Sequence, residues 1–183
     1  HFLELGNKYT GDCTYIKAGE NDILIDAGSK ASSIGAIAAY LNEHVSDGVL
    51  EYVIVTHAHE DHYAGFATPE GTDSIFDLFE CEVIIDFAKT NKSETAYMQA
   101  NYLRERADEI AAGAVHYTAA ECIEQNKSTF DLGAGIELEI LDSYYYYNKA
   151  STENDYSVCL MINEGDNHYL FTGDLEERGE EYL

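Results

Sequence analysis

The stretch THAHEDHYAG, residues 56–65, is the part of the sequence that decides the fold. It places three of the chain's seven histidines and two acidic residues within the six positions from His57 to His62. Ligand-type side chains are costly to hold together unless a cation offsets the repulsion between the acids. This concentration therefore indicates a metal site.

The histidine cluster follows directly on EYVIVT, residues 51–56, an apolar run typical of a buried strand. His57, His59 and Asp61 stand at alternate positions after it, so an extended strand end would direct all three side chains to one side. Neutral imidazoles and a carboxylate are ligands that zinc, manganese and iron(II) accept. The alternative interpretation, a polar loop whose histidines only form hydrogen bonds, is disfavoured by the length of the pattern.

Outward from this cluster, strand and helix patterns alternate along the chain. Strand patterns occupy residues 1–5, 12–17, 21–28, 51–57, 81–88, 135–142, 155–163 and 167–173. Helical patterns occupy residues 32–45, 73–80, 93–113 and 174–183. Strands first, then alternation, then strands again predict an α/β fold in which two sheets pack together with helices outside.

The composition is that of a globular chain with strong acidity. Of the 183 residues, 45% are hydrophobic and 25% charged, which is enough to bury a core in one domain, residues 1–183. Lysine and arginine number 10 against 35 acids, so the net charge of −25 disfavours broad nucleic-acid binding. No apolar run approaches the roughly 20 residues of a membrane span. The four cysteines form no CxxC pair, so they suggest neither a zinc knuckle nor a disulfide framework.

The HxHxDH pattern resembles the signature of the metallo-β-lactamase fold superfamily. ILIDAG at 23–28 is similar to that superfamily's first motif, and YLFTGD at 169–174 is similar to its later motif. The resemblance implies an αββα sandwich of two mixed sheets with outer helices. It also implies that the C-terminal part of the fold is incomplete, because the family's last ligating histidine should follow beyond Leu183.

The resemblance also implies a set of metal ligands. It assigns His57 and His59 to one metal ion, Asp61 and His62 to a second, and Asp174 to both. Asp61 is then the residue expected to serve catalysis as well as metal binding, and Asp26 is expected to support the ligands from behind. The implied cofactors are two divalent metal ions, with zinc the first choice and manganese the second. Asp174 has an alternative role as the N-cap of a final helix, with Glu177 completing a capping box.

The implied reaction is metal-dependent hydrolysis through a hydroxide that bridges the two metal ions. The family's third histidine has no counterpart in STENDYSVCL, residues 151–160, and the first site is therefore expected to lack one identified ligand. Instead, NDYSVCLMI and the opening of the chain resemble the DNA-uptake-protein (ComEC-like) branch and secreted phosphorylcholine esterases. Both relatives imply a small-molecule or phosphodiester substrate and an extracytoplasmic location.

Other interpretations remain open on the sequence alone. A degenerate binding domain would keep the fold without a full ligand set, and a hydrolase of a lactone or thioester would use the same metals. The tyrosine run at 144–147 is suited to stacking on a base or enclosing a choline-type cation. Packing within the fold is the alternative role of these rings.

Overall fold

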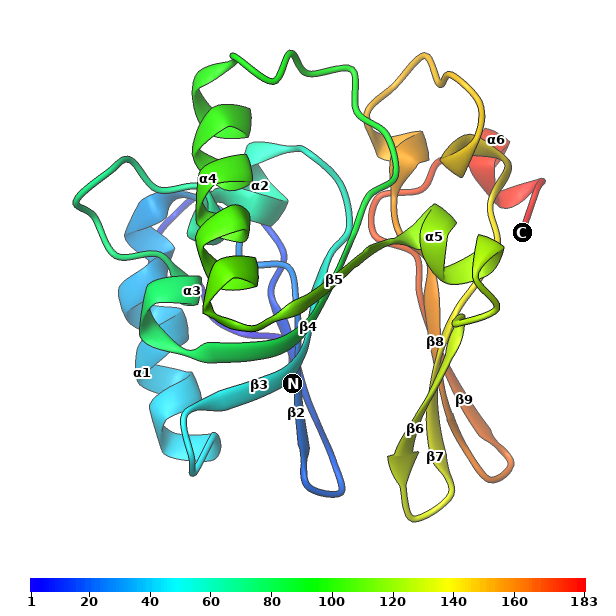
Figure 1. Cartoon of the computed structure of the whole chain (residues 1–183), viewed down its shortest axis with the longest axis horizontal. Helices are drawn as coiled ribbons and strands as arrows, with labels where there is room; N and C mark the ends of the chain where they lie inside the picture. The colour runs from blue at the N-terminus through cyan, green and yellow to red at the C-terminus, as the bar shows by residue number, and fades with distance from the viewer.

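Two β-sheets lie face to face in the computed structural model, which describes residues 1–183 (Figure 1). The first sheet has the order β1-β2-β3-β4-β5, formed by Thr14–Ala18, Asn21–Ile25, Val49–Val55, Glu80–Asp86 and Val115–Thr118. In it β1 is antiparallel to β2 and the other pairs are parallel. The second sheet has the order β6-β7-β8-β9, formed by Thr129–Gly133, Ile136–Ile140, Leu160–Glu164 and Asn167–Phe171. All its pairs are antiparallel, so it is not mixed as the resemblance implied.

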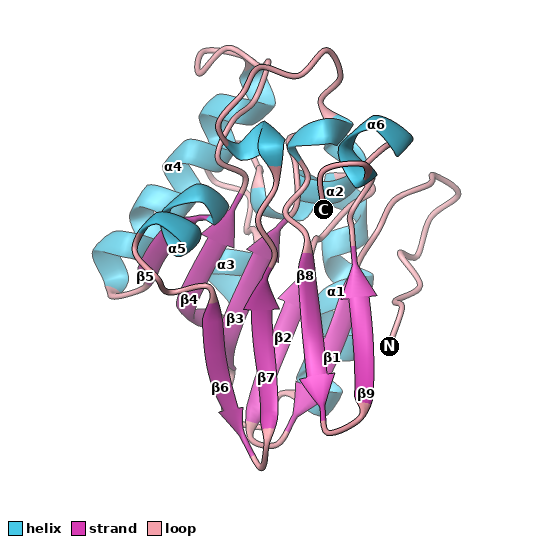
Figure 2. Cartoon of the chain, turned by 90° about the vertical axis from the view of Figure 1, so that its right-hand side faces the viewer, coloured by secondary structure: helices cyan, strands magenta, loops and turns pink.

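Six α-helices connect and cover these strands. They are α1 (Ile34–His44), α2 (Glu60–Tyr63), α3 (Ile75–Leu78), α4 (Tyr97–Ala112), α5 (Ala119–Glu124) and α6 (Glu177–Glu180). Figure 1 shows α1, α3 and α4 on the outer side of the five-stranded sheet. Figure 2 shows the four-stranded sheet from the front, with α5 and α6 at one end and no helix along its strands. None of the helices combines the length and apolar character needed to cross a membrane.

The predicted α/β sandwich is confirmed, and its core explains why. One cluster of 39 buried residues joins the inner faces of both sheets to the helices. The central strand β3 is covered on one face by helices and on the other by the second sheet, so Val53, Ile54 and Val55 are all fully buried. A strand buried on both faces reads as a continuous apolar run, which is the pattern of residues 51–56.

The parallel strands end at one edge of the first sheet, and this alignment positions the site. Ile25 pairs with Ile54 across β2 and β3, and Val55 pairs with Asp86 across β3 and β4. Consequently, the segments that follow these three strands begin side by side. The loops before β8 and after β9 reach the same end of the molecule (Figure 2).

Several local elements differ from the sequence-based prediction. The strand predicted at 155–163 begins at Leu160, because Asn154–Tyr156 form a short 3-10 helix, η4. α5 and β6 were not predicted, since α5 has only six residues and β6 is largely exposed. In the tyrosine run, Tyr145 and Tyr146 are buried, and Tyr146 Oη accepts a hydrogen bond from the backbone N–H of Cys159. Those two rings therefore have the packing role.

A buried charged cluster fastens α4 and β5 to the end of β4. Asp86 is fully buried and accepts hydrogen bonds from Tyr102 Oη (2.7 Å) and from Arg106, and its second oxygen lies 2.9 Å from His116 Nε2. Burial raises the pKa of Asp86, but the His116 hydrogen bond, the Arg106 charge and the Tyr102 hydroxyl outweigh it and lower the pKa below its ordinary value. The ionised carboxylate is therefore the form that stabilises this cluster.

Asp86→Asn is expected to destabilise the fold by about 3 kcal/mol at neutral pH, because it leaves the partly buried Arg106 without its partner. The lowered pKa of Asp86 means that this contribution is present above the ordinary value and is lost as pH falls through the folded value. The difference in unfolding free energy between wild type and variant should therefore shrink as the pH falls below about 4 in urea titrations. Asp108 is exposed and lies on α4, the helix that carries Arg106. Asp108→Asn should change stability by less than about 0.5 kcal/mol. Equal effects of the two substitutions would contradict this role for Asp86.

Candidate metal centre

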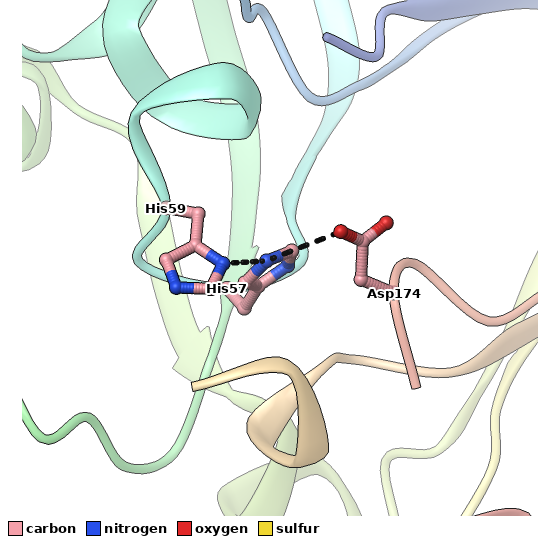
Figure 3. Close-up of side chains that lie close together, drawn as sticks. All are labelled: His57, His59 and Asp174. Carbon is pink, nitrogen blue, oxygen red and sulfur yellow. Dashed lines mark hydrogen bonds and ion pairs between the residues drawn. The ribbon is translucent and has the colours of Figure 1, made fainter. Parts of the chain in front are cut away.

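The centre lies where the loops after β2, β3 and β9 meet at the carboxyl edge of the first sheet. His57 and His59 follow β3, His62 lies in the short helix α2, and Asp174 lies in the loop after β9. Figure 3 shows His57 and His59 from one segment facing Asp174 from another. Residues more than 110 positions apart in the sequence thus converge on one point.

Asp174 stands between the two buried histidines. Its Oδ2 atom lies 3.3 Å from His62 Nε2 and 3.9 Å from His57 Nε2. His59 Nδ1 lies 3.0 Å from His57 Nε2. The capping alternative for Asp174 is wrong, because the N-cap of α6 is Glu176.

Two groups of three ligand atoms result, and both include Asp174. The first contains His57, His59 and Asp174, and the second contains Asp12, His62 and Asp174, with the atoms of each group within 4.8 Å of one another. Imidazole nitrogens and carboxylate oxygens in this combination are the donors that zinc, manganese and iron(II) accept. The residues present therefore fit a pair of divalent cations that share one carboxylate.

Asp26 and Thr56 fix the orientation of the two buried histidines. Asp26 accepts hydrogen bonds from Thr56 N–H (2.8 Å) and from the Thr56 hydroxyl (2.7 Å), and His62 Nδ1 donates to it at 2.8 Å. Because the only hydroxyl proton of Thr56 is used on Asp26, the Thr56 oxygen accepts from His57 Nδ1, at 3.1 Å. The neutral His57 therefore presents an unprotonated Nε2 toward Asp174, and His62 presents its Nε2 there while Nδ1 stays hydrogen-bonded to Asp26.

Ser157 connects the first group to the second sheet. Its buried hydroxyl accepts a hydrogen bond from Asp174 N–H (3.2 Å) and lies 3.4 Å from His57 Nδ1. In the sequence this serine belongs to the NDYS stretch, residues 154–157, which stands where the family's third histidine is expected and has no histidine. The structure thus places there a residue that orients ligands, which the sequence analysis did not identify as a site residue.

Asp61 is the expected ligand that the structure does not bring into either group. Its carboxylate makes no hydrogen bond or ion pair, whereas its backbone carbonyl accepts a hydrogen bond from Asp12 N–H at 3.0 Å. Asp61 and His62 are consecutive in the short helix α2, so their side chains leave the helix about 100° apart. Asp12, whose Oδ2 lies 3.9 Å from His62 Nε2, belongs to the second group, and the charge of Asp61 contributes to the raised pKa of Asp12. The stretch LGNKYTGD, residues 5–12, ends on this residue, and the resemblance of the chain's opening to the ComEC-like branch was the available signal.

Glycines allow the loops around Asp12 to approach so closely. Gly28 N–H donates to the carbonyl of Asp12, and a Cβ on Gly28 would lie only 1.5 Å from the carbonyl oxygen of Asp61. Gly65 has the same role against Ala27, whose carbonyl oxygen would lie 2.5 Å from a Cβ at that position. No other residue type fits these two positions without moving backbone.

The electrostatic environment of the two buried histidines differs sharply. Burial lowers the pKa of His57 to about 2, and the neighbouring His62, His59 and Lys92 act in the same direction. His57 is therefore a neutral ligand at physiological pH.

Carboxylates determine the pKa of the other buried histidine, His62. Burial lowers the pKa of His62, but the hydrogen bond and charge of Asp26 and the charges of Asp174 and Asp12 outweigh it and raise the pKa to about 9. Partial burial raises the pKa of Asp12; His62 opposes this, and the charges of the nearby carboxylates add to it. Three carboxylates around one imidazole thus form a strongly cation-attracting centre.

Comparison with known proteins agrees with this fold. Residues 6–68 match the family model described as the metallo-beta-lactamase superfamily. The metallo-beta-lactamase fold protein YhfI from Bacillus subtilis superimposes with a TM-score of 0.51 and 13% identity, over 93% of this chain and 57% of that chain. The chain therefore has the metallo-β-lactamase fold and spans 57% of the length of YhfI.

Two further solved structures are similar at lower scores. A variant of CmlA beta-hydroxylase gives a TM-score of 0.46 and 16% identity over 90% of this chain and 29% of that chain. The short form of human tRNase Z gives a TM-score of 0.41 and 13% identity over 94% of this chain and 67% of that chain. No curated protein matches the sequence.

Asp12→Asn is expected to reduce the metal content of the purified chain from about two ions to about one, because it removes the only carboxylate specific to the second group. Asp61→Asn should retain both ions, since the Asp61 side chain belongs to neither group. Metal analysis after dialysis against a weak chelator measures both. Loss of an ion in Asp61→Asn, with both ions retained in Asp12→Asn, would instead support the ligand set implied by the sequence resemblance.

Gly173→Ala tests the contact that Ser157 makes with the first group. Gly173 has a φ of +54°, and a Cβ there would lie 2.9 Å from Ser157 Oγ. We expect a loss of about 1–3 kcal/mol in stability and at least a tenfold loss in metal affinity, measured by urea titration and calorimetry. Gly35→Ala, where a Cβ meets no atom within 4 Å inside α1, should stabilise the fold by about 0.5–1 kcal/mol and leave metal affinity unchanged. Wild-type metal affinity in Gly173→Ala would contradict this role.

Proposed function

We propose that the chain is a metal-dependent hydrolase that acts on phosphodiester bonds. The single observation that carries the proposal is the position of Asp174, whose Oδ2 faces Nε2 of both His57 and His62 and so joins the two ligand groups. The superfamily whose model matches residues 6–68 consists generally of metal-dependent hydrolases. The geometry and the fold therefore support the same class of reaction.

When bound, a pair of divalent cations would supply Lewis acidity at the attacked centre and a water whose pKa lies near 7. The chain's own contribution is to hold the ligands in place before the cations arrive. Asp26 keeps the His62 proton on Nδ1, and Thr56 keeps the His57 proton on Nδ1. The Nε2 lone pair of His57 is thereby available without any rearrangement, whereas His62, whose pKa is raised to about 9, would release its Nε2 proton when a cation binds.

Neither the cysteines nor Ser157 is suited to act as a nucleophile in a covalent mechanism. All four cysteines are buried and unpaired, and burial raises the pKa of Cys122 and of Cys159 to about 12. Ser157 is fully buried, and its hydroxyl is engaged by Asp174 N–H. Attack by water is therefore the route that fits these residues.

The phosphodiester substrate class is supported by the resemblance of the NDYS stretch and the YLFTGD motif to the ComEC-like branch and to phosphorylcholine esterases. The structure adds a physical reason for the NDYS resemblance, since Ser157 of that stretch holds a ligand histidine. Zinc is the first choice of metal and manganese the second, because mixed histidine and carboxylate donors suit both. The extracytoplasmic location implied by the same relatives stays a prediction.

The proposal is tested with the metal-loaded chain and bis(4-nitrophenyl) phosphate, with His59→Ala as the variant. We expect hydrolysis by wild type and a loss of at least about 100-fold in kcat/KM for the variant, because one of three donors of the first group is removed. His168→Ala, an exposed histidine on β9, is the matched control and should retain full activity.

Three outcomes would overturn the proposal. Equal turnover by wild type and His59→Ala would show that the metal centre takes no part in the reaction. Turnover of 4-nitrophenyl acetate or a thioester without turnover of the phosphodiester would assign the chain to ester hydrolysis. Retention of no metal after loading with zinc or manganese would make it a binding domain.

A further inference from the structure

The lysines of this acidic chain are gathered near the metal centre. Four of its seven lysines lie on loops at the carboxyl edge of the first sheet and the matching end of the second, although the net charge is −25. They follow β2, β4 and β7 in the sequence: Lys30, Lys89, Lys92 and Lys149. Such a local excess of cations in a strongly acidic protein requires an explanation.

Two of these lysines line one surface pocket. It has a volume of about 420 Å³ and is lined by Lys89, Thr90, Asn91, Lys149 and Tyr156. The loop after β4 supplies the first three residues, and the segment between β7 and β8 supplies the other two. Figure 1 shows these two segments approaching one another at the upper end of the molecule.

Hydrogen bonds hold the two walls of this pocket together. Asn91 N–H donates to Glu153 at 2.9 Å, and the Asn91 side-chain amide donates to the carbonyl of Ala150 at 3.4 Å. The Tyr156 hydroxyl donates to Asn91 Oδ1 (3.3 Å) and accepts from Ala150 N–H (3.0 Å). Lys89 lies two residues before Asn91 and Lys149 directly precedes Ala150, so this network fixes the backbone from which both ammonium groups extend.

The two lysines have no carboxylate partner. Neither ammonium group lies within 4.0 Å of a carboxylate, whereas Lys17 pairs with Asp22 and Lys30 pairs with Glu60. The carboxylate of Glu153, the buried acid beside the pocket, accepts from Asn91 N–H instead. With 35 acidic residues in the chain, two neighbouring cations left without a partner indicate a place for an anion that the chain does not supply.

The pocket adjoins the metal centre through the backbone of one segment. Tyr156 of the pocket directly precedes Ser157, whose hydroxyl lies 3.4 Å from His57 Nδ1. On the other wall, the loop that carries Lys89 begins at the end of β4, which pairs in register with the strand that leads to His57. A substrate bound at the centre would therefore extend toward the two lysines.

We propose that this pocket binds a second phosphate group of the substrate, next to the phosphodiester bond at the metal centre. The inference rests on the proposed function and specifies its substrate class as a phosphodiester that carries a further phosphate. Two ammonium groups and the Thr90 hydroxyl supply the donors that a phosphate dianion requires.

The first arm of the test measures binding without catalysis. Calorimetry compares thymidine 3′,5′-bisphosphate with thymidine 5′-monophosphate on the metal-loaded chain, and we expect the bisphosphate to bind about tenfold more tightly. In the Lys89→Gln/Lys149→Gln double variant this preference should disappear. Lys127→Gln removes an exposed lysine that contacts Tyr117 away from the centre, and the preference should remain. Equal affinities for the two nucleotides in wild type would overturn the pocket assignment.

The second arm measures turnover of two matched chromogenic substrates. Thymidine 5′-(4-nitrophenyl phosphate) and its 3′-phosphorylated form differ only in the second phosphate, and wild type should prefer the latter about tenfold in kcat/KM. The double variant should lose this ratio. Hydrolysis of both substrates at equal rates would overturn the pocket while the hydrolase stands. Lysine-dependent bisphosphate binding without any turnover would overturn the hydrolase while the pocket stands.

Discussion

The carboxylate of Asp26 is the constraint on which the rest of this centre depends. It lies directly after β2 with a φ of +58°, is buried, and accepts three hydrogen bonds from Thr56 and His62. A buried carboxylate is tolerated only when its oxygens are fully engaged, so the loop after β3 and the helix α2 must close over it. The positions of His57 and His62, and through them the placement of Asp174, follow from satisfying this one group.

Much of the first sheet and part of the centre could be predicted from the sequence because each rests on a local pattern. The continuous apolar run before His57 indicated a buried strand, and the alternation of strands with helices indicated an α/β fold in which packed sheets carry outer helices. The convergence of His57, His59 and Asp174 was anticipated through the family resemblance. The structure brings them together from two separate segments, a relation that local patterns alone do not contain.

The remaining parts depend on contacts between distant segments, and local patterns do not encode them. Asp12 reaches His62 because Gly28 lets two loops approach within backbone contact, and the sequence of residues 6–12 alone does not specify that contact. Asp61 was favoured by extended spacing, but the chain turns into a helix at Glu60, so the alternation that directs His57 and His59 to one side does not continue to Asp61. Ser157 was not predicted as a site residue, because a single serine does not indicate a metal site until its neighbours in space are known.

The two ligand groups differ in burial, and this difference bears on the order in which they bind metal ions. His57 is fully buried and His59 half-buried, whereas the Asp12 side chain that completes the other group is 64% exposed on a loop before β1. An exposed side chain loses conformational entropy when it coordinates a metal ion, whereas side chains already held by packing and hydrogen bonds lose little. We therefore expect stepwise loading, in which the group of His57, His59 and Asp174 takes an ion before the group completed by Asp12, so that the protein would hold one ion when metal is scarce.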